Sequence, residues 1–309
     1  MQKIPLIAVV GPTASGKTKL GIELAKAFDG EVVSADSMQV YKGISIASAA
    51  PTKEETEGIP HHLVEFLELG SEFSVADYVN LAKDKIKDIY NRGKMPILVG
   101  GTGLYVNSLI DGIEFSSQDN NLEIRNRLEK EMELLGAEEM LRRLSEIDRI
   151  TASKLHPNNR RRILRALEVY ETTGITFSAQ NELSRVGSEF DTLIFGVTYQ
   201  DREKLYERIN LRVDNMLSNG LLDEAKTTLD LPIGKGAMQA IGHKELHKFL
   251  RGEQTFDEAV ETLKMQTRRY AKRQLTWFNR NQDIQWLYQD NEDVTAKAIQ
   301  IAKGVIKNG

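Results

Sequence analysis

The chain reads Gly11-Pro12-Thr13-Ala14-Ser15-Gly16-Lys17-Thr18 directly after an apolar run at residues 6–10. The stretch matches the phosphate-loop pattern G-x-x-x-x-G-K-[ST] in full, between an expected strand and an expected helix. Glycines let the backbone curl so that successive N–H groups point at phosphate oxygens. The helix N-terminus and Lys17 add positive charge, and the Thr18 hydroxyl can bind Mg²⁺. The pattern predicts a polyphosphate site, and it leaves open whether ATP, GTP or a pyrophosphate group of another molecule binds there.

Short apolar segments alternate with amphipathic segments around this loop. The expected strands span residues 6–10, 31–35, 95–99 and 191–198, and the expected helices span residues 17–28, 75–90, 204–219, 221–229 and 256–280. Such alternation is typical of a parallel sheet covered by helices on both faces. Residues 121–179 are instead helical and highly charged. We therefore expect a P-loop NTPase-like α/β core of residues 1–115 and 190–309, with an all-helical insertion at residues 116–189.

The composition of the 309 residues is ordinary for a folded protein, with 40% hydrophobic and 28% charged residues. The absence of cysteine excludes disulfides, a thiol nucleophile and Cys-ligated zinc. The apolar run at residues 6–10 is too short to span a membrane, and a glycine-rich turn follows it rather than a cleavage site. We therefore expect a cytoplasmic protein with no membrane partner, and we expect a monomer.

Basic residues are unevenly distributed, although the net charge is −4. Residues 154–165 and 268–280 are rich in Lys and Arg, and neither stretch contains an acidic residue. Cations at helical spacing neutralise phosphates, and the aromatic residues of the second stretch could stack on unpaired bases. The alternative is a solvated helix face with Trp277 in the core, and the residues alone leave both open.

Asp36 stands at the carboxyl end of the second expected strand. In an open α/β sheet this edge is where ligands bind. A carboxylate that faces the phosphate loop could act as a general base or hold Mg²⁺ through water. A helix N-cap or an ordinary loop carboxylate is the alternative, so the position of Asp36 alone does not settle its role.

Several motifs in a fixed order indicate a family. They are DSMQVY (36–41), HHL (61–63), FSVADY (73–78), GGTGLY (100–105), RRILRALE (161–168), AIGHKE (240–245) and TRRYAKRQLTWF (267–278). Together with the phosphate loop, these blocks resemble the tRNA dimethylallyltransferase (isopentenyl-tRNA transferase) family across nearly the whole chain. The resemblance implies transfer of a dimethylallyl group from its diphosphate to the exocyclic N6 amine of an adenosine 3′ of the anticodon in tRNA.

The resemblance also implies roles on the donor side. Asp36 would be the general base, and Thr102 would lie beside it and help to orient it. The diphosphate would bind Lys17, Thr18 with Mg²⁺, and the loop residues Gly11, Thr13, Ala14, Ser15 and Gly16. Arg208 or Arg212 would complete the clamp, and we favour Arg212 as the catalytic one.

The acceptor side would include the anticodon stem-loop of tRNA, and the helical insertion at residues 116–189 would be a tRNA-binding domain. The residues implied there are Asp36, Ser37, Met38, Gln39, Thr102, Arg125, Arg160, Arg161, Arg162, Ile163, Leu164, Arg165, Gln239, Gly242, His243, Lys244, Arg269, Lys272, Arg273 and Trp277. Gln39 and residues 242–244 would contact the target base. His243 stands where the family often has tyrosine, and it would still offer a flat ring.

The chain departs from the family pattern at residues 43–51, which read GISIASAAP where the family usually reads closer to GMDIGTAKP. Substrate contacts and loop geometry there are therefore not fixed by the resemblance. Asp36, Lys17 and Thr102 are intact, so activity is still expected. The competing functions are a nucleotide or small-molecule kinase that uses ATP, and a non-catalytic RNA-binding NTPase switch.

Overall fold

The computed structural model describes residues 3–113, 122–184, 187–234 and 236–306. The chain divides into two compact units, the first formed by Met1–Ile110 with Glu189–Gly309 and the second by Asp111–Ser188. The insertion expected from the sequence, residues 116–189, overlaps the second unit closely.

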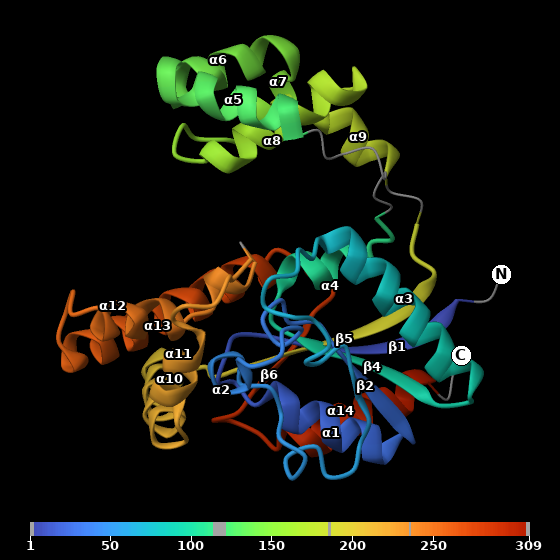
Figure 1. Ribbon diagram of the computed structural model, residues 1–309. Helices are drawn as coiled ribbons and strands as arrows, with labels where there is room; N and C mark the ends of the chain where they lie inside the picture. The colour runs from blue at the N-terminus through green and yellow to red at the C-terminus, as the bar shows by residue number, and fades with distance from the viewer. Residues whose placement is uncertain (1–2, 114–121, 185–186, 235, 307–309) are drawn as a thin grey trace. The chain divides into compact units, whose positions relative to one another are not determined.

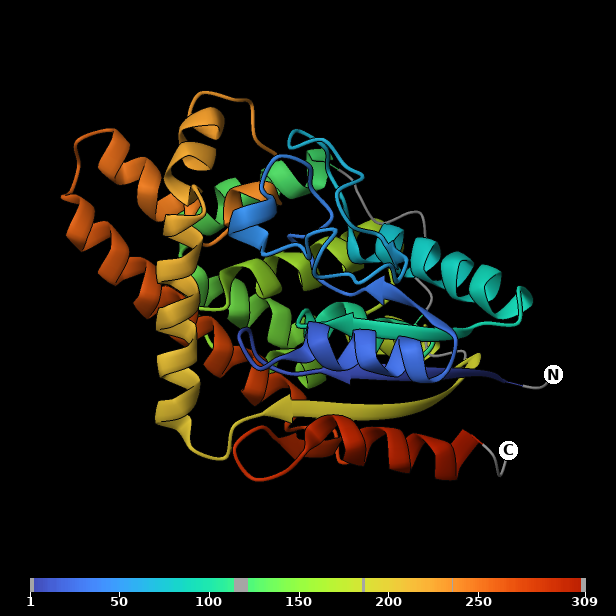
Figure 2. The same cartoon turned by 90° about the horizontal axis from the view of Figure 1, so that it is seen from below.

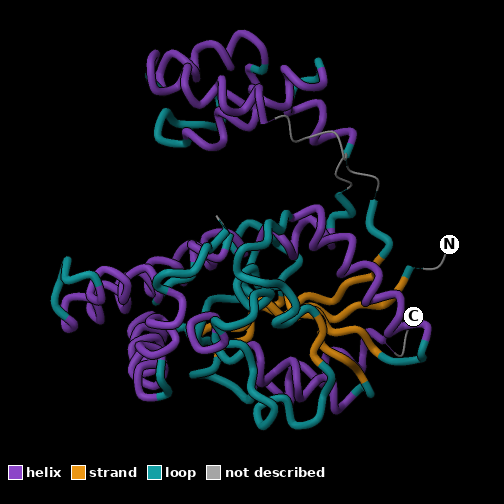
Figure 3. The backbone as a smooth tube through the Cα atoms, in the orientation of Figure 1, coloured by secondary structure: helices purple, strands orange, loops and turns teal. Residues whose placement is uncertain are grey.

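A parallel sheet is the centre of the first unit (Figures 1 and 3). Its six strands lie in the order β3-β2-β4-β1-β5-β6. They are β1 (Ile4–Val10), β2 (Gly30–Ser34), β3 (His61–His62), β4 (Met95–Gly100), β5 (Phe190–Thr198) and β6 (Gln285–Tyr288). The α/β fold class and the four expected strands are confirmed, whereas β3 and β6 were not anticipated. Strand β5 pairs with β1 from Ile4 opposite Phe190 to Val10 opposite Gly196, so the chain rejoins the sheet after the second unit.

Alternating side chains of β1 separate two layers of helices. The helices that cover the sheet are α1 (Lys17–Ala27), α3 (Val75–Asn91), α4 (Gly103–Ile110) and α14 (Val294–Ile306). Leu6, Ala8 and Val10 pack in one core with α3 and α4. Ile7 and Val9 pack in the other core with α1 and α14, which run along the sheet in Figure 2. This period of two is the pattern of a strand that is buried on both faces.

The carboxyl ends of three neighbouring strands meet at one edge of this sheet. Strand β4 lies between β1 and β2, with Val10 opposite Gly100 and Ser34 opposite Val99. The phosphate loop follows β1, Asp36 follows β2, and Thr102 follows β4. Because the three strands are parallel, these loops come together where an open α/β sheet binds ligands.

Further helices of the first unit pack against one another around a separate apolar cluster. They are α10 (Arg202–Ser218), α11 (Leu221–Thr228), α12 (His243–Leu250) and α13 (Phe256–Phe278), with the short α2 (Ser45–Ser48) and the 3₁₀ turn η1 (Ala237–Gln239) nearby. The N-cap residue of helix α13 is Thr255, which forms a capping box with Glu258. Its first half carries Leu263 in this cluster, and its last residue, Phe278, packs in the core of the sheet. Helix α13 therefore joins the helical group to the sheet.

The second unit is entirely helical in its described residues. Its helices are α5 (Leu122–Leu135), α6 (Ala137–Ile147), α7 (Arg149–Ala152), α8 (Arg160–Thr173) and α9 (Phe177–Leu183). They enclose a core that includes Leu128, Met140, Leu144 and Ile163. In neither unit is a described helix long and apolar enough to cross a membrane.

Candidate active site

The phosphate loop has a backbone that small residues make possible. Gly11, Ala14 and Gly16 have positive φ angles of 142°, 63° and 89°. A Cβ atom at Gly11 would lie 2.2 Å from the Val197 carbonyl oxygen, so only glycine fits there. A non-glycine residue such as Ala14 in this region is strained, and such strain is concentrated at ligand-binding sites. The N-cap residue of helix α1 is Gly16, which has no side chain to cap the helix, and N–H groups at such a helix start suit an anion.

The polar groups of the loop are held inside the fold. The Ser15 hydroxyl is buried and has no hydrogen-bond partner among the described residues. The Ser15 carbonyl accepts a hydrogen bond from Gln289 Nε2 at 3.1 Å, and Lys17 Nζ donates to the Pro12 carbonyl at 2.6 Å. The loop is thus shaped before any ligand arrives.

Two cations at this site, Lys17 and Arg212, repel each other. The pKa of Lys17 is lowered to about 7, first by burial and then by the charge of Arg212, while Asp36 acts in the opposite direction. The pKa of Arg212 is also lowered, again mainly by burial. Two positive groups brought together out of water need a counter-charge, and a diphosphate would supply it. Arg208, one turn earlier on α10, is exposed, so the structure brings Arg212 rather than Arg208 to Lys17 and Asp36.

The carboxylate of Asp36 is oriented through one of its two oxygens. Oδ1 accepts hydrogen bonds from the backbone N–H groups of Met38 at 2.8 Å and Gln39 at 3.4 Å. No hydrogen bond to a residue in the described ranges involves Oδ2. The turn after β2 therefore fixes the carboxylate and leaves one oxygen able to accept a proton.

Thr102 fixes the backbone on both sides of Asp36. Its N–H donates to the Ala35 carbonyl at 3.1 Å, and its Oγ1 accepts from the Ser37 N–H at 2.9 Å. The Thr102 hydroxyl also forms a hydrogen bond with Tyr270 of α13, whose pKa is raised, mainly by burial. Thr102 thus acts on Asp36 through the backbone of the neighbouring residues.

Gln39 is half-buried, and both ends of its amide have partners within the protein. Its Oε1 accepts from the Ser34 hydroxyl at 2.8 Å, and its Nε2 donates to the Ala49 carbonyl at 3.1 Å. These contacts tie the turn that carries Asp36 to the end of α2. A base that binds Gln39 would share or replace one of these hydrogen bonds.

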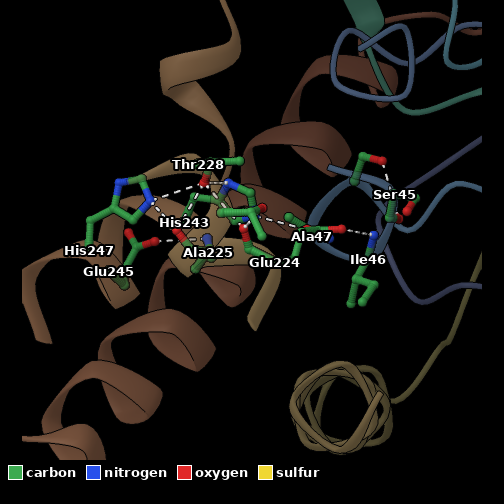
Figure 4. Close-up of polar contacts among 12 residues, drawn as sticks. Ser45, Ile46, Ala47, Glu224, Ala225, Thr228, His243, Glu245 and His247 are labelled. Atoms are coloured by element: carbon green, nitrogen blue, oxygen red, sulfur yellow. Dashed lines mark hydrogen bonds and ion pairs between the residues drawn. The ribbon is translucent and has the colours of Figure 1, made fainter. Parts of the chain in front are cut away.

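The carboxylate of Glu224 joins two further segments (Figure 4). Its oxygens accept from the N–H groups of Ile46 at 2.7 Å and Ala47 at 2.9 Å, and Oε1 lies 2.8 Å from His243 Nε2. Helix α2 has no cap from the side chain of its own N-cap residue, Ile44. Glu224 supplies that cap from α11. It also connects the unusual stretch at residues 45–50 with His243, the second position that departs from the family pattern.

The ring of His243 is only 5% exposed, in contrast to the flat accessible ring expected from the sequence. Its Nδ1 lies 3.1 Å from the Thr228 hydroxyl, which is also 3.2 Å from His247 Nε2. Because a hydroxyl both donates and accepts, His243 has partners in its neutral and its charged form. The neighbouring Gly242 is also buried, and Lys244 is exposed. The side chain of Gln239 lies outside the described part of the structure.

Comparison with known proteins places this site in a family. A sequence profile described as IPP transferase matches residues 39–282. The chain belongs to the IPP transferase family. A tRNA dimethylallyltransferase of Caldanaerobacter subterraneus subsp. tengcongensis is 48% identical over 292 residues, which cover 93% of each chain. These findings confirm the resemblance that the motifs indicated.

Solved structures of the family agree with the fold. The full-length tRNA isopentenylpyrophosphate transferase of Bacillus halodurans is 42% identical, with a TM-score of 0.73 over 99% of this chain and 96% of that one. A eukaryotic dimethylallyltransferase acting on tRNA is 32% identical, with a TM-score of 0.86 over 98% of this chain and 80% of that one. The P-loop NTPase-like architecture expected from the sequence is therefore confirmed.

The cations expected on the tRNA side of this family are found on two helices. On α13, Arg269, Lys272 and Arg273 are exposed, and none of them forms an ion pair with a residue that the structure describes. Trp277 of the same helix is half-buried and donates to Asn107 Oδ1 at 3.3 Å. The guanidinium of Arg280 lies over its ring at 5.9 Å. Trp277 thus has a packing role at the core edge.

On α8, in the second unit, the expected residues differ among themselves. Arg160, Arg161 and Arg162 are exposed. The side chain of Ile163 is 0% exposed in the core of the unit, and Leu164 packs partly against that core. In contrast to the expectation for Ile163, its side chain is therefore not on a surface that RNA could reach. Its apolar character alone is the signal for this.

Arg125 and Arg165 are tied to one acidic residue. Arg125 forms ion pairs with Glu129 at 3.2 Å and Glu168 at 3.6 Å, and Arg165 lies 3.3 Å from Glu168. Glu168 is buried, with a side-chain exposure of 2%. Because Glu168 is buried between α5 and α8, both Arg side chains point toward this helix pair. The Glu168 carboxylate therefore already neutralises part of their positive charge.

Four residues that form contacts in and around the site were not anticipated in that role from the sequence. They are Glu224, Tyr270, Gln274 and Gln289. All are polar side chains on segments far along the chain from the loops they bind. Only Gln274 had a sequence signal. It follows Tyr270 by four residues, and this spacing predicts that both side chains lie on the same face of a helix.

Proposed function

We propose that the chain transfers the dimethylallyl group of dimethylallyl diphosphate to the exocyclic N6 amine of the adenosine 3′ of the anticodon in tRNA, and releases diphosphate. The names of relatives such as the 48% identical tRNA dimethylallyltransferase support this reaction. In this chain the observation that carries the proposal is Asp36. Its oriented carboxylate has one oxygen with no hydrogen-bond partner in the described ranges, and its charge acts on the half-buried cations Lys17 and Arg212.

The donor diphosphate would bind the phosphate loop. The N–H groups at the start of α1, the Lys17 ammonium and the Arg212 guanidinium supply positive charge where the leaving group's negative charge develops. The residues also suit Mg²⁺, because the ion prefers oxygen and usually binds through one or two protein groups plus phosphates. The Thr18 hydroxyl would hold it, and the ion would neutralise charge on the diphosphate.

The acceptor amine would lie between the donor and Asp36. As the bond between C1 of the allylic group and its phosphate oxygen breaks, a bond forms from C1 to N6. The N6 proton moves to Asp36 Oδ2, and the electron pair of the broken bond leaves with the diphosphate. Holding the amine and the allylic carbon in line supplies much of the acceleration, because an aromatic amine is a weak nucleophile.

The tRNA would be held by the exposed cations of α13 and α8. Phosphate neutralisation by Arg269, Lys272 and Arg273 supplies affinity without reading the sequence. A base in a structured loop must leave its stack to reach a buried site. Gln39 and the exposed Lys244 would meet that base, whereas the buried ring of His243 would support this segment from within. A cytoplasmic location and a monomeric state of the protein are compatible with this function. Both remain predictions.

The test uses unmodified tRNA and dimethylallyl diphosphate labelled in the allylic group, with the product collected on filters. Label should enter tRNA only when Mg²⁺ and intact Asp36 are present, and free diphosphate should appear in equal amount. A parallel reaction with ATP labelled in the terminal phosphate tests the kinase alternative. Phosphate transfer from ATP without allylic transfer would overturn the proposal.

A further inference from the structure

One amide side chain joins the two loops that carry the donor and base residues. Gln274 Oε1 accepts a hydrogen bond from the Thr13 N–H of the phosphate loop at 2.8 Å. Gln274 Nε2 donates to the Gly101 carbonyl, next to Thr102, at 3.0 Å. The side chain is 5% exposed, and it comes from α13. It therefore bridges two sheet-edge loops from a third element.

The chemistry of both contacts calls for an amide. The phosphate loop presents a donor and the β4 loop presents an acceptor, and a carboxamide supplies one acceptor oxygen and N–H donors in the same planar group. An apolar side chain would leave both backbone groups buried without partners, which costs free energy. A carboxylate would satisfy Thr13 only. The fit is also tight, because a Cβ atom at Gly101 would lie 2.1 Å from Gln274 Nε2.

The bridge sets where donor and base stand relative to each other. Thr13 is within the loop that would hold the diphosphate, and its N–H is engaged by Gln274 rather than directed at a phosphate. Gly101 precedes Thr102, which fixes the backbone on either side of Asp36. One turn earlier on α13, Tyr270 reaches the Thr102 hydroxyl. Gln274 thus connects the loop that would hold the leaving group with the loop that fixes the backbone around Asp36.

We propose that Gln274 is a positioning residue, which fixes the spacing between the diphosphate loop and Asp36 that in-line transfer requires. This inference rests on the proposed transferase function. A displacement of about 1 Å in such a geometry can lower the rate by about 100-fold. A residue that only stabilised the core would instead affect unfolding and leave the turnover of the folded enzyme unchanged.

The test compares Q274M and Q274E with wild type and with Q254M. Gln254 is a matched control, because its half-buried amide also donates to a backbone carbonyl, that of Glu245 at 2.9 Å, outside the two loops. At saturating substrates, kcat of Q274M should fall by about 10- to 100-fold. Its Kd for tRNA and the kcat of Q254M should stay within about twofold of wild type.

The Q274E variant distinguishes positioning from packing through pH. The carboxylate of Q274E still accepts a hydrogen bond from the Thr13 N–H. It has no proton to donate to the Gly101 carbonyl, so that second hydrogen bond is lost. Once protonated, a carboxyl group both donates and accepts, so it can restore the bridge. The kcat of Q274E relative to wild type should therefore rise as pH falls from 8 to 6, since burial raises the pKa of a carboxyl group. A packing role predicts a ratio that does not change with pH.

The failure of this inference is distinguishable from failure of the proposed function. If wild type itself transfers no label to tRNA, the transferase assignment is wrong. If wild type is active and a folded Q274M has normal kcat, with a pH-independent Q274E ratio, the positioning role is overturned. If Q274M does not fold, the pH dependence of the Q274E ratio decides alone.

Discussion

Diphosphate binding should take up a proton at neutral and mildly alkaline pH, and Lys17 is the group responsible. Burial and Arg212 lower the pKa of Lys17 to about 7 in the protein without ligand. A bound diphosphate favours the charged ammonium, so the pKa rises on binding. Above pH 7 the protein must therefore gain a proton to bind. The apparent Kd should rise by a factor of about 2 at pH 7, about 11 at pH 8 and about 100 at pH 9, relative to acidic pH.

Calorimetric titration with inorganic diphosphate, in two buffers of different ionisation enthalpy, measures both Kd and proton uptake. The ligand titrates too, so K17R is the control: arginine stays charged over this range and reports only the ligand's share. Wild type should take up close to one proton more than K17R at pH 9. Parallel Kd profiles for the two proteins between pH 7 and 9 would refute the reasoning.

Three further predictions concern the base, the RNA side and the Glu224 network. D36N should lower kcat by about 10²- to 10⁴-fold in the label-transfer assay, because the amine proton loses its acceptor, while tRNA affinity measured by filter binding stays normal; a large loss of affinity with normal kcat would contradict this role. The double variant R269E/R273E should weaken tRNA binding and reduce the slope of log K against log salt by about two units, with kcat at saturation little changed; an unaltered salt slope would remove α13 from the interface. E224Q replaces an acceptor that serves two N–H groups and His243, so it should lower the unfolding free energy by about 1–3 kcal/mol in denaturant titration. It should also lower kcat/KM for tRNA more than for the donor, and equal losses for both substrates would contradict an acceptor-side role.

The core of the site could be anticipated because its positions follow from local patterns. Gly11–Thr18, Asp36 and Thr102 each come directly after an apolar run that predicts a buried strand. Because ligands bind at the carboxyl ends of parallel strands, Asp36 was expected to face the phosphate loop, whereas the place of Thr102 followed from the family resemblance. The parallel direction of the strands follows from their alternation with helices, whereas the order that places β4 between β2 and β1 comes from the structure.

Other features depend on contacts that no local pattern contains. Strand β6, Gln285–Tyr288, is four residues long and becomes a strand because it pairs with β5. The ring of His243 is buried by Glu224 and Thr228, which lie on another helix. Ile163 differs, because its hydrophobicity already indicated burial and only its place inside a basic motif suggested RNA. For that residue the physical pattern was the better guide.

The order of the strands has a consequence for which atoms can meet. Strand β4 separates β1 from β2, so the loop that would hold the diphosphate and the turn that carries Asp36 start two strand spacings apart. Adjacent strands lie about 4.8 Å apart, which gives about 10 Å between those starting points. That span leaves room between the two starting points for the reacting groups of a donor and an acceptor. The order of the strands thereby sets the separation between the phosphate loop and the turn that carries Asp36.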